Sequence, residues 1–204
     1  MLVYVEFISR LAGISLEEFH RRSRGAQTLW ADSYGDDLIV LNVGRTWRIG
    51  PEPEYLCVWF TPGQGLERID DWEHLFGAGA HDTVNVEFEA VARIDRAGCY
   101  TALVPPVQGT RGRYYIEWFE VAEDASTGQL RERFERRAAA HGELELNIVA
   151  LPMGPMAPRS LGFAAWGLPT FGAAEPLATS AGELGPLAQV VDASLYADLG
   201  REQL

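Results

Sequence analysis

The chain has 204 residues, of which 47 % are hydrophobic and 23 % charged, and its formal net charge at pH 7 is −12. This is the composition of a globular protein with length for one large domain or two small ones. So acidic a chain repels phosphate backbones, which argues against nucleic acid and anionic membrane surfaces as partners. No apolar run reaches the roughly 20 residues that a membrane-spanning helix requires.

The pattern of the first half predicts the order β-α-β-β-α-β. Ser15-Leu16-Glu17-Glu18 has the form of a capping box, in which Ser15 caps a helix and Glu18 reaches back to it. Runs of β-branched and aromatic residues predict strands, and apolar residues at helical spacing predict a second helix. The predicted strands are 2–8, 38–43, 55–60 and 84–94, and the last of them continues less regularly through 97–103. The predicted second helix is 66–76.

The same order returns after a Pro/Gly-rich stretch at 105–112, which reads as a linker. Ser126 is expected to cap a helix that ends at Gly142, and the small-residue segment 171–182 is expected to form a poor helix. The predicted strands are 113–119, 143–151, 161–166 and 187–195. The chain therefore divides into a module at 1–104, the linker, and a second module at 113–204.

Short motifs repeat in the same order and at the same places in the two halves. The most telling is Tyr4-Val5-Glu6-Phe7, which returns as Tyr115-Ile116-Glu117-Trp118 and puts a carboxylate in the middle of an apolar strand both times. The other five pairs are Phe19–Arg22 with Phe134–Arg137, Leu41–Val43 with Leu146–Ile148, Ile49–Pro51 with Met153–Pro155, Trp59 with Trp166, and Ala97–Leu103 with Ala193–Leu199. Several ordered matches predict a tandem duplication.

This arrangement resembles the dimeric α/β-barrel superfamily, which includes antibiotic-biosynthesis monooxygenases, EthD-like proteins, muconolactone-isomerase-like enzymes and stress-responsive barrel proteins. The resemblance implies an α+β fold of two ferredoxin-like βαββαβ modules, each a four-stranded antiparallel sheet with two helices on one face. The two sheets would pack into an intramolecular pseudo-dimeric barrel. The resemblance carries no catalytic signature, and a fold by itself assigns no chemistry.

Glu6 and Glu117 are the first candidates for chemistry. If Val3, Val5 and Phe7 face the helices, the two carboxylates face the interior between the sheets, where desolvation would raise their pKa and suit them to acid–base work. In the alternative interpretation each glutamate pairs with an arginine, or with tyrosine or asparagine neighbours, and only holds the halves together. The arginines considered for that role are Arg45, Arg48, Arg93 and Arg113.

Asn42, Asn147 and His20 are the remaining polar candidates. Each asparagine interrupts an apolar strand and could stabilise an oxyanion, or could be a satisfied buried amide. His20 follows Phe19 at the border of the apolar stripe of the first helix and could reach a pocket between helix and sheet as a catalytic residue. A lone histidine at such a border is ordinarily solvated surface.

Aromatic side chains are the candidates for ligand contacts. Tyr4, Tyr115, Trp59 and Trp166, together with Asn147, could wall a pocket for an aromatic compound, although tryptophans are more often core residues.

No nucleotide, flavin or metalloprotease motif is present, and Cys57 and Cys99 form neither a disulfide framework nor a metal spacing with the histidines. Some relatives of the fold bind haem, but no motif here supports it. The sequence therefore predicts no cofactor and no metal. The cysteines suggest reduced core thiols, and the chain begins with a strand and no leader pattern, so a cytoplasmic location is expected.

Two functions remain open at this level. The first is a cofactor-independent oxygenase, isomerase or cyclase of a small apolar or aromatic compound, with Glu6 or Glu117 moving the proton. The second is a non-catalytic ligand-binding or stress-associated protein. Both imply a small-molecule ligand, and the sequence leaves open a homodimer beyond the internal pseudo-dimer.

Overall fold

The computed structural model describes residues 1–23, 25, 38–46, 54–60 and 84–199. Its elements place four strands in each half of the chain. The strands are β1 (Leu2–Arg10), β2 (Leu38–Arg45), β3 (Tyr55–Phe60), β4 (Ala92–Ala102), β5 (Arg113–Val121), β6 (Glu145–Pro152), β7 (Gly162–Gly167) and β8 (Ala188–Asp198). The named helices are α3 (Val84–Glu89), α4 (Thr127–Ala140) and α5 (Glu175–Thr179), with 3-10 turns η1 (Gly154–Met156), η2 (Phe171–Ala174) and η3 (Ala181–Leu187). A further helix near the N-terminus covers residues 16–23.

The eight strands hydrogen-bond into one closed antiparallel sheet in the order β1-β3-β2-β8-β5-β7-β6-β4. Within each half the pairing is extensive, whereas two short ladders join the halves. One pairs β2 with β8 at three positions, and the other pairs β4 with β6 at three positions. The fold is thus α+β with an eight-stranded antiparallel sheet, as predicted from the element order.

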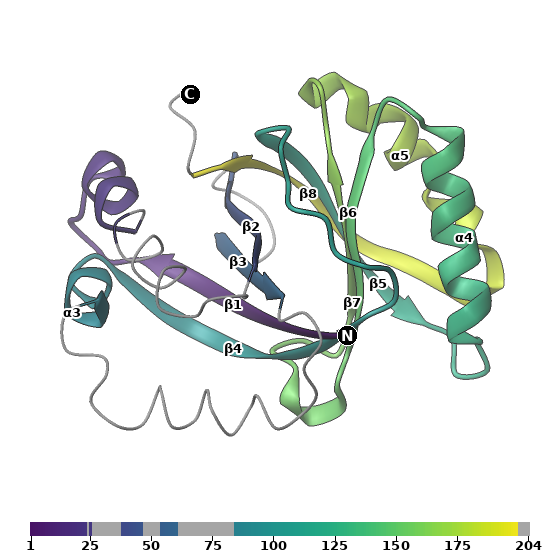
Figure 1. Cartoon of the computed structure of the whole chain (residues 1–204), viewed down its shortest axis with the longest axis horizontal. Coiled ribbons are helices and arrows are strands. Elements are labelled where there is room, and N and C mark those ends of the chain that lie inside the picture. The colour runs from purple at the N-terminus through teal and green to yellow at the C-terminus, as the bar shows by residue number, and fades with distance from the viewer. Residues whose placement is uncertain (24, 26–37, 47–53, 61–83, 200–204) are drawn as a thin grey trace.

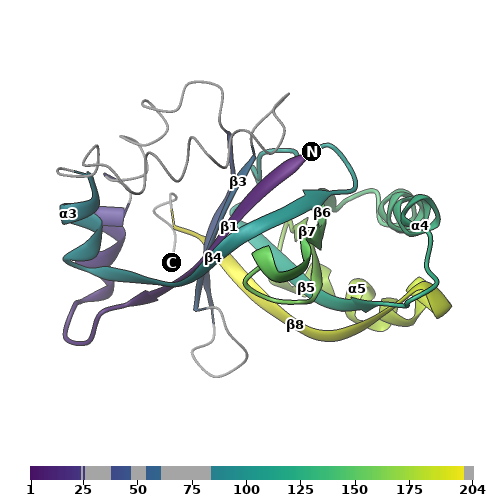
Figure 2. The same ribbon diagram turned by 90° about the horizontal axis from the view of Figure 1, so that it is seen from below.

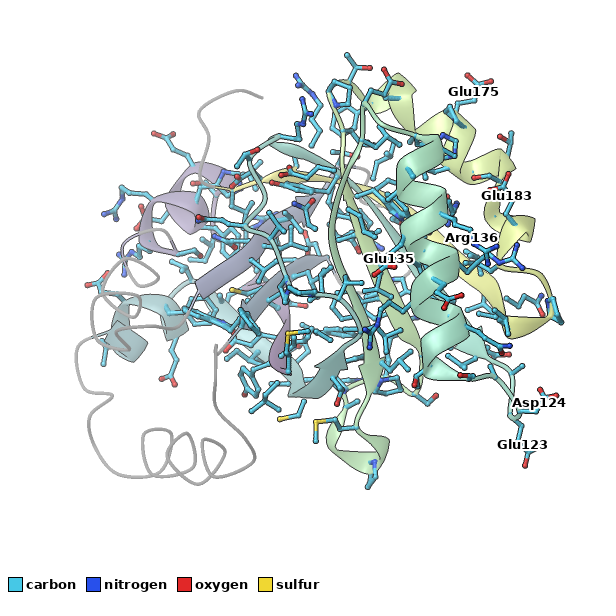
Figure 3. All side chains as sticks on the ribbon, turned by 45° about the vertical axis from the view of Figure 1, so that its right-hand side comes forward. Glu123, Asp124, Glu135, Arg136, Glu175 and Glu183 are labelled. Atoms are coloured by element: carbon cyan, nitrogen blue, oxygen red, sulfur yellow. The ribbon has the colours of Figure 1, made fainter. Side chains whose placement is uncertain are left out.

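The helices lie on the two outer sides of the sheet (Figures 1 and 2). In Figure 1, α3 and the N-terminal helix cover the half formed by β1 and β4, while α4 and α5 cover the half formed by β5 to β8. Acidic side chains line the outer edge of the second half, where Figure 3 shows Glu123, Asp124, Glu175 and Glu183 pointing away from the sheet. Among the described residues, no helix is both long enough and apolar enough to cross a membrane.

The interior of the closed sheet is apolar and is shared by both halves. Val5 and Phe7 of β1 meet Ile116 and Trp118 of β5 in one buried cluster, and the Phe7 and Trp118 rings pack edge to face with centroids 5.5 Å apart. The predicted assignment of sheet faces was therefore wrong, because Val3, Val5 and Phe7 face the interior and not the helices. Alternation along a strand separates two faces but does not say which one is turned inward.

The pairing registers of the two halves repeat. Glu6 lies opposite Cys57 and Ala97, while Glu117 lies opposite Ala164 and Ala193. A register shift follows Phe7 in the β1–β4 ladder and follows Trp118 at the equivalent place in the β5–β8 ladder.

One of the sequence matches is out of register. Asn42 lies opposite Cys57, whereas Asn147 falls in the irregularity between Leu146 and Ile148, and the residue equivalent to Asn42 is Val149, opposite Ala164. The two asparagines therefore do not occupy equivalent positions in the sheet, although their motifs match in the sequence.

The predicted fourth strand was wrong in its first part. Residues Val84–Glu89 form helix α3, and β4 begins only at Ala92. Val84, Val86 and Phe88 alternate as in a strand, but in the helix that forms Phe88 is buried and Val86 is 60 % exposed. The predicted helix at 66–76 lies outside the described residues.

The two predicted helix caps differ in the structure. The backbone N–H of Glu18 donates to Ser15 Oγ over 3.1 Å, as a capping box requires. The Glu18 carboxylate does not reach back, because it binds Arg21 and Arg22 instead. Ser126 is the N-cap residue of α4 but makes no side-chain cap hydrogen bond.

Candidate functional site

Polar side chains gather on the helix-facing side of the first half of the sheet, which we call the first layer. Adjacent strands set Tyr4 opposite Trp59 and Glu6 opposite Cys57, with Asn42 opposite Cys57 on its other side. These residues share a face because each lies in register with its neighbour and none belongs to the interior cluster. The structure therefore brings together four of the predicted site residues, Tyr4, Glu6, Asn42 and Trp59.

Glu6 is the most unusual group of the first layer. It is only 2 % exposed, and the Trp59 indole Nε1–H donates to its Oε2 over 3.3 Å. Its Oε1 has no hydrogen-bond partner within the described part of the chain. Burial raises the pKa of the Glu6 carboxyl to about 7, and the Trp59 hydrogen bond offsets only part of that rise. At neutral pH this group can therefore both give and take a proton.

The neighbours of Glu6 are held in their neutral forms. Burial raises the pKa of the Cys57 thiol well above its ordinary value, and the nearby Glu6 charge adds to the rise. The pKa of the Tyr4 phenol is raised by the same two causes, burial first. Neither side chain can then serve as an anionic nucleophile at neutral pH, because each would have to ionise in an apolar site.

The N-terminal helix covers the first layer with an aromatic contact. Phe19 is buried and packs on Tyr55 of β3 with ring centroids 4.3 Å apart. His20 is half-buried beside Phe19, with the two rings 5.7 Å apart. Ser23, one turn further along, is 2 % exposed, and its Oγ has no hydrogen-bond partner among the described residues.

The second half carries the same set of residues in a different electrostatic state. Trp166 Nε1–H donates to Glu117 Oε2 over 3.1 Å, as Trp59 does to Glu6. Here, however, Arg137 of α4 binds both carboxylate oxygens, with Nη1 to Oε2 at 2.7 Å and Nη2 to Oε1 at 2.8 Å. The side chains of this pair are 1 % and 0 % exposed. Glu117 is thus a fully partnered, buried carboxylate.

Arg137 itself is held on every side. Its Nε donates to Ser180 Oγ over 3.1 Å and its Nη2 to the Leu177 carbonyl over 2.6 Å. The guanidinium also lies 5.3 Å from the centroid of the Trp166 ring, within cation–π range. Such a planar, bidentate and stacked arrangement suits arginine and no other side chain.

Glu117 therefore pairs with an arginine, as the alternative interpretation holds, but none of the four arginines named for it is the partner. Arg137 lies in the same half of the chain as Glu117, so this pair does not join the two halves. Arg137 was not among the predicted partners, because these were chosen from strands and loops and not from the helix that covers the strands. The repeated Phe19–Arg22 and Phe134–Arg137 motif carried the signal, since it places an arginine three residues after a buried phenylalanine in both halves.

The equivalent arginine of the first half, Arg22, turns away from the sheet. Its Nε binds Glu18 at 2.6 Å and its Nη1 binds Glu87 of α3 at 3.3 Å, with the side chain 30 % exposed. The residue four positions before Arg137 is Arg133, whereas Glu18 stands four positions before Arg22. Charges at this spacing face each other on a helix, so Glu18 attracts Arg22 outward while Arg133 repels Arg137.

The remaining predicted residues are dispersed. Asn147 is fully buried and donates from Nδ2 to the Val107 carbonyl over 3.3 Å, so it fastens the linker and does not join Glu117. Tyr115 lies opposite Trp166 in the second half, where burial and the Glu117 charge raise the pKa of its phenol to about 12. Trp118 faces the interior of the sheet. Arg48 lies outside the described residues.

Candidate metal ligands do not cluster in the part of the chain that the structure describes. No group of three or more His, Cys, Asp or Glu side chains is arranged there to hold a metal ion.

Comparisons with known proteins identify the fold. No protein-family model matches the chain, and no curated protein matches it by sequence. Solved structures match over nearly its whole length. A haem-binding protein from Thermus thermophilus has a TM-score of 0.59 and 9 % identity, covering 97 % of this chain and 90 % of that one.

Two further structures match as fully. A mutant chlorite dismutase from Candidatus Nitrospira defluvii, solved with cyanide, has a TM-score of 0.57 and 6 % identity, covering 97 % and 90 %. A protein from Lactobacillus acidophilus that is provisionally described as a monooxygenase has a TM-score of 0.58 and 12 % identity, covering 98 % and 97 %. Identities this low establish a shared ferredoxin-like α+β fold and nothing finer.

These comparisons overturn the prediction of a cofactor-independent enzyme. The absence of a ligand motif in the sequence led to that prediction, yet the chain shares its fold over 97 % of its length with a protein described as haem-binding. Haem ligands are single side chains brought together by the fold, so a short-motif search does not detect them.

Proposed function

We propose that this chain is a haem-dependent oxidoreductase that holds its cofactor in the first layer. The observation that carries the proposal is the structural similarity, across nearly the whole chain, to a haem-binding protein and to a chlorite dismutase. A bound haem would supply one-electron and oxygen chemistry that side chains do not have.

The second half does not fit such a group. The space between its sheet and helices is filled by Phe134, Trp166 and Leu177, all fully buried, and is crossed by the Glu117–Arg137 ion pair. A flat macrocycle would have to displace this packed and fully bonded layer, which costs both cavity and desolvation energy.

The side chains of the first layer are also buried or half-buried, but among the described residues no ion pair crosses it as Glu117–Arg137 crosses the second half. His20 provides an imidazole, the commonest axial ligand of haem iron, and Phe19, Tyr55 and Trp59 provide flat apolar walls. Glu6 would place a carboxyl group that can hold a proton at neutral pH beside the bound group. In this role Tyr4 and Asn42 flank the site as binding residues.

A hemin titration followed by visible absorbance tests the proposal. We expect the intact chain to bind one hemin saturably with a shifted main absorption band. Replacing His20→Ala should change the spectrum and weaken binding by about tenfold or more, as loss of an axial ligand does. The matched control is His141→Ala at the end of α4, which should leave both unchanged. Absence of saturable binding, or equal effects of the two variants, contradicts the proposal.

The organisation of the chain supports a related proposal about its origin. We infer that residues 1–104 and 113–204 are duplicated modules joined by the linker at 105–112, and that they form an intramolecular barrel. The repeated registers of Glu6 and Glu117 support this. A small-molecule ligand, a cytoplasmic location, the exclusion of nucleic acid and membrane partners, and a homodimer beyond the internal pair stay predictions.

A further inference from the structure

We propose that the first layer binds a ligand carrying a planar cationic nitrogen group, an amidinium or guanidinium, through the carboxylate of Glu6. The second half of the same chain shows which group complements this set of residues, because the Arg137 guanidinium binds Glu117 there. The inference does not rest on haem, since it concerns a carboxylate and its charge partner. It applies to the haem-free chain, because haem and this ligand would contact the same walls of Phe19, Tyr55 and Trp59.

The two sites have the same framework. In each, a glutamate in the middle of the first strand of its half accepts a hydrogen bond from a tryptophan on the neighbouring strand, at 3.3 Å for Glu6 and 3.1 Å for Glu117. In each, a tyrosine two residues earlier lies opposite that tryptophan. What the first site lacks, among the described residues, is the cation.

The difference in bonding concerns a single oxygen. Arg137 binds Oε1 as well as Oε2 of Glu117, whereas Oε1 of Glu6 has no partner in the described part of the chain. A buried carboxylate oxygen without a donor is unfavourable, and buried polar atoms left in this state commonly mark a functional site. A planar group with two parallel N–H donors would satisfy both oxygens.

The chain's own candidate for this role is engaged elsewhere. Arg22 stands at the position equivalent to Arg137 but is held outward by Glu18 and Glu87. Because both of its partners are acidic and partly exposed, Arg22 keeps its charge satisfied without approaching Glu6. Because Glu18 and Glu87 hold Arg22 away from Glu6, a cation from outside the chain can bind in the first layer.

The surroundings of Glu6 define the rest of the ligand. Ile8, Phe19, Tyr55 and Trp59 form one apolar and aromatic cluster around the first layer. The buried Ser23 Oγ offers a further hydrogen-bonding group. A ligand that joins an amidinium to an aromatic ring matches both features, and benzamidine is the simplest such probe, with benzamide as its neutral isostere.

Calorimetric titration of the full chain with benzamidine tests the inference. We expect saturable binding of benzamidine, at least about tenfold weaker binding of benzamide, and a loss of about tenfold or more for Glu6→Gln. Binding should strengthen from about pH 6 to about pH 8 in the wild type as the Glu6 carboxyl, whose pKa is about 7, ionises. Glu120→Gln, which removes an exposed carboxylate from β5, is the control and should bind as the wild type does.

A second variant tests the same idea with Glu6 in place. Glu18→Arg gives the N-terminal helix the charge pattern of α4, and Glu87→Gln removes the second acidic partner of Arg22, which lies on α3. In the double variant Arg22 should turn inward and compete with benzamidine. Weaker binding in this folded double variant supports the inference. It is overturned if benzamidine does not bind, if benzamide binds equally well, or if Glu6→Gln binds as the wild type does.

Discussion

At the scale of single residues, the two buried glutamates show how one charge partner changes a site. Glu6 and Glu117 sit in equivalent registers and each accepts a hydrogen bond from a tryptophan. Only Glu117 also has an arginine among the described residues, and it has become part of a rigid network. Glu6 retains an oxygen without a hydrogen-bond partner in the described structure and a pKa near neutrality, which are features typical of functional carboxylates.

The raised pKa of Glu6 predicts a pH-dependent stability. The folded state holds the proton more tightly than the unfolded state, whose carboxyl titrates near 4.5, so the contribution of Glu6 is favourable below that value. It is lost as the pH rises through about 7, by up to roughly 3 kcal/mol. Glu6→Gln does not titrate at this position. In chemical unfolding, its free energy of unfolding minus that of the wild type should therefore increase by roughly 3 kcal/mol between pH 4.5 and 8 and then stay constant. A constant difference across that range would show that Glu6 titrates normally.

Arg137 and Arg22 form a matched pair for a second test. Replacing Arg137→Ala leaves Glu117 as a buried charge without a partner and should lower the free energy of unfolding by about 3–5 kcal/mol. Replacing Arg22→Ala removes only partly exposed ion pairs and should cost less than about 1 kcal/mol. Equal losses in urea unfolding would mean that the buried pair does not differ from a surface one.

At the scale of secondary-structure elements, the helix caps offer an independent check. Ser15 accepts the Glu18 backbone N–H and Ser126 makes no such bond. Ser15→Ala should therefore lower the free energy of unfolding by about 1 kcal/mol, whereas Ser126→Ala should have a much smaller effect. Thermal unfolding of the two variants measures the difference, and a larger loss for Ser126→Ala would refute the cap assignment.

The elements also show what the sequence could and could not reveal. The positions of the eight strands along the chain and the match of Glu6 with Glu117 follow from local patterns, because β-branched runs and turn residues act over short distances. The segment 84–89 alternates like a strand but forms α3, since tertiary burial of Phe88 outweighs a six-residue pattern. Which face of each strand is turned toward the interior, and which residue pairs with Glu117, depend on contacts between distant elements. A local sequence pattern does not contain this information.

At the scale of the whole molecule, closure of the sheet makes each half depend on the other. Phe7 and Trp118 meet in the shared interior, and the β2–β8 and β4–β6 ladders seal it. A separated half would expose an apolar sheet face and two unpaired strand edges. The fragments 1–104 and 113–204 should therefore be insoluble or should dimerise when expressed alone. A soluble monomer of residues 1–104 in sedimentation analysis would contradict this dependence.

The two halves of the molecule carry the same set of glutamate, tryptophan and tyrosine, and within the described chain only the second half neutralises its carboxylate with an arginine. The most direct test is carbon NMR of protein labelled at glutamate side-chain carboxyls, titrated with pH in the wild type and in Glu6→Gln. We predict one signal with a midpoint near pH 7 that is missing from Glu6→Gln. If the signal that is missing from that variant titrates near pH 4.5, Glu6 is an ordinary solvated or paired carboxylate. That result would contradict the proposal of a functional site in the first half.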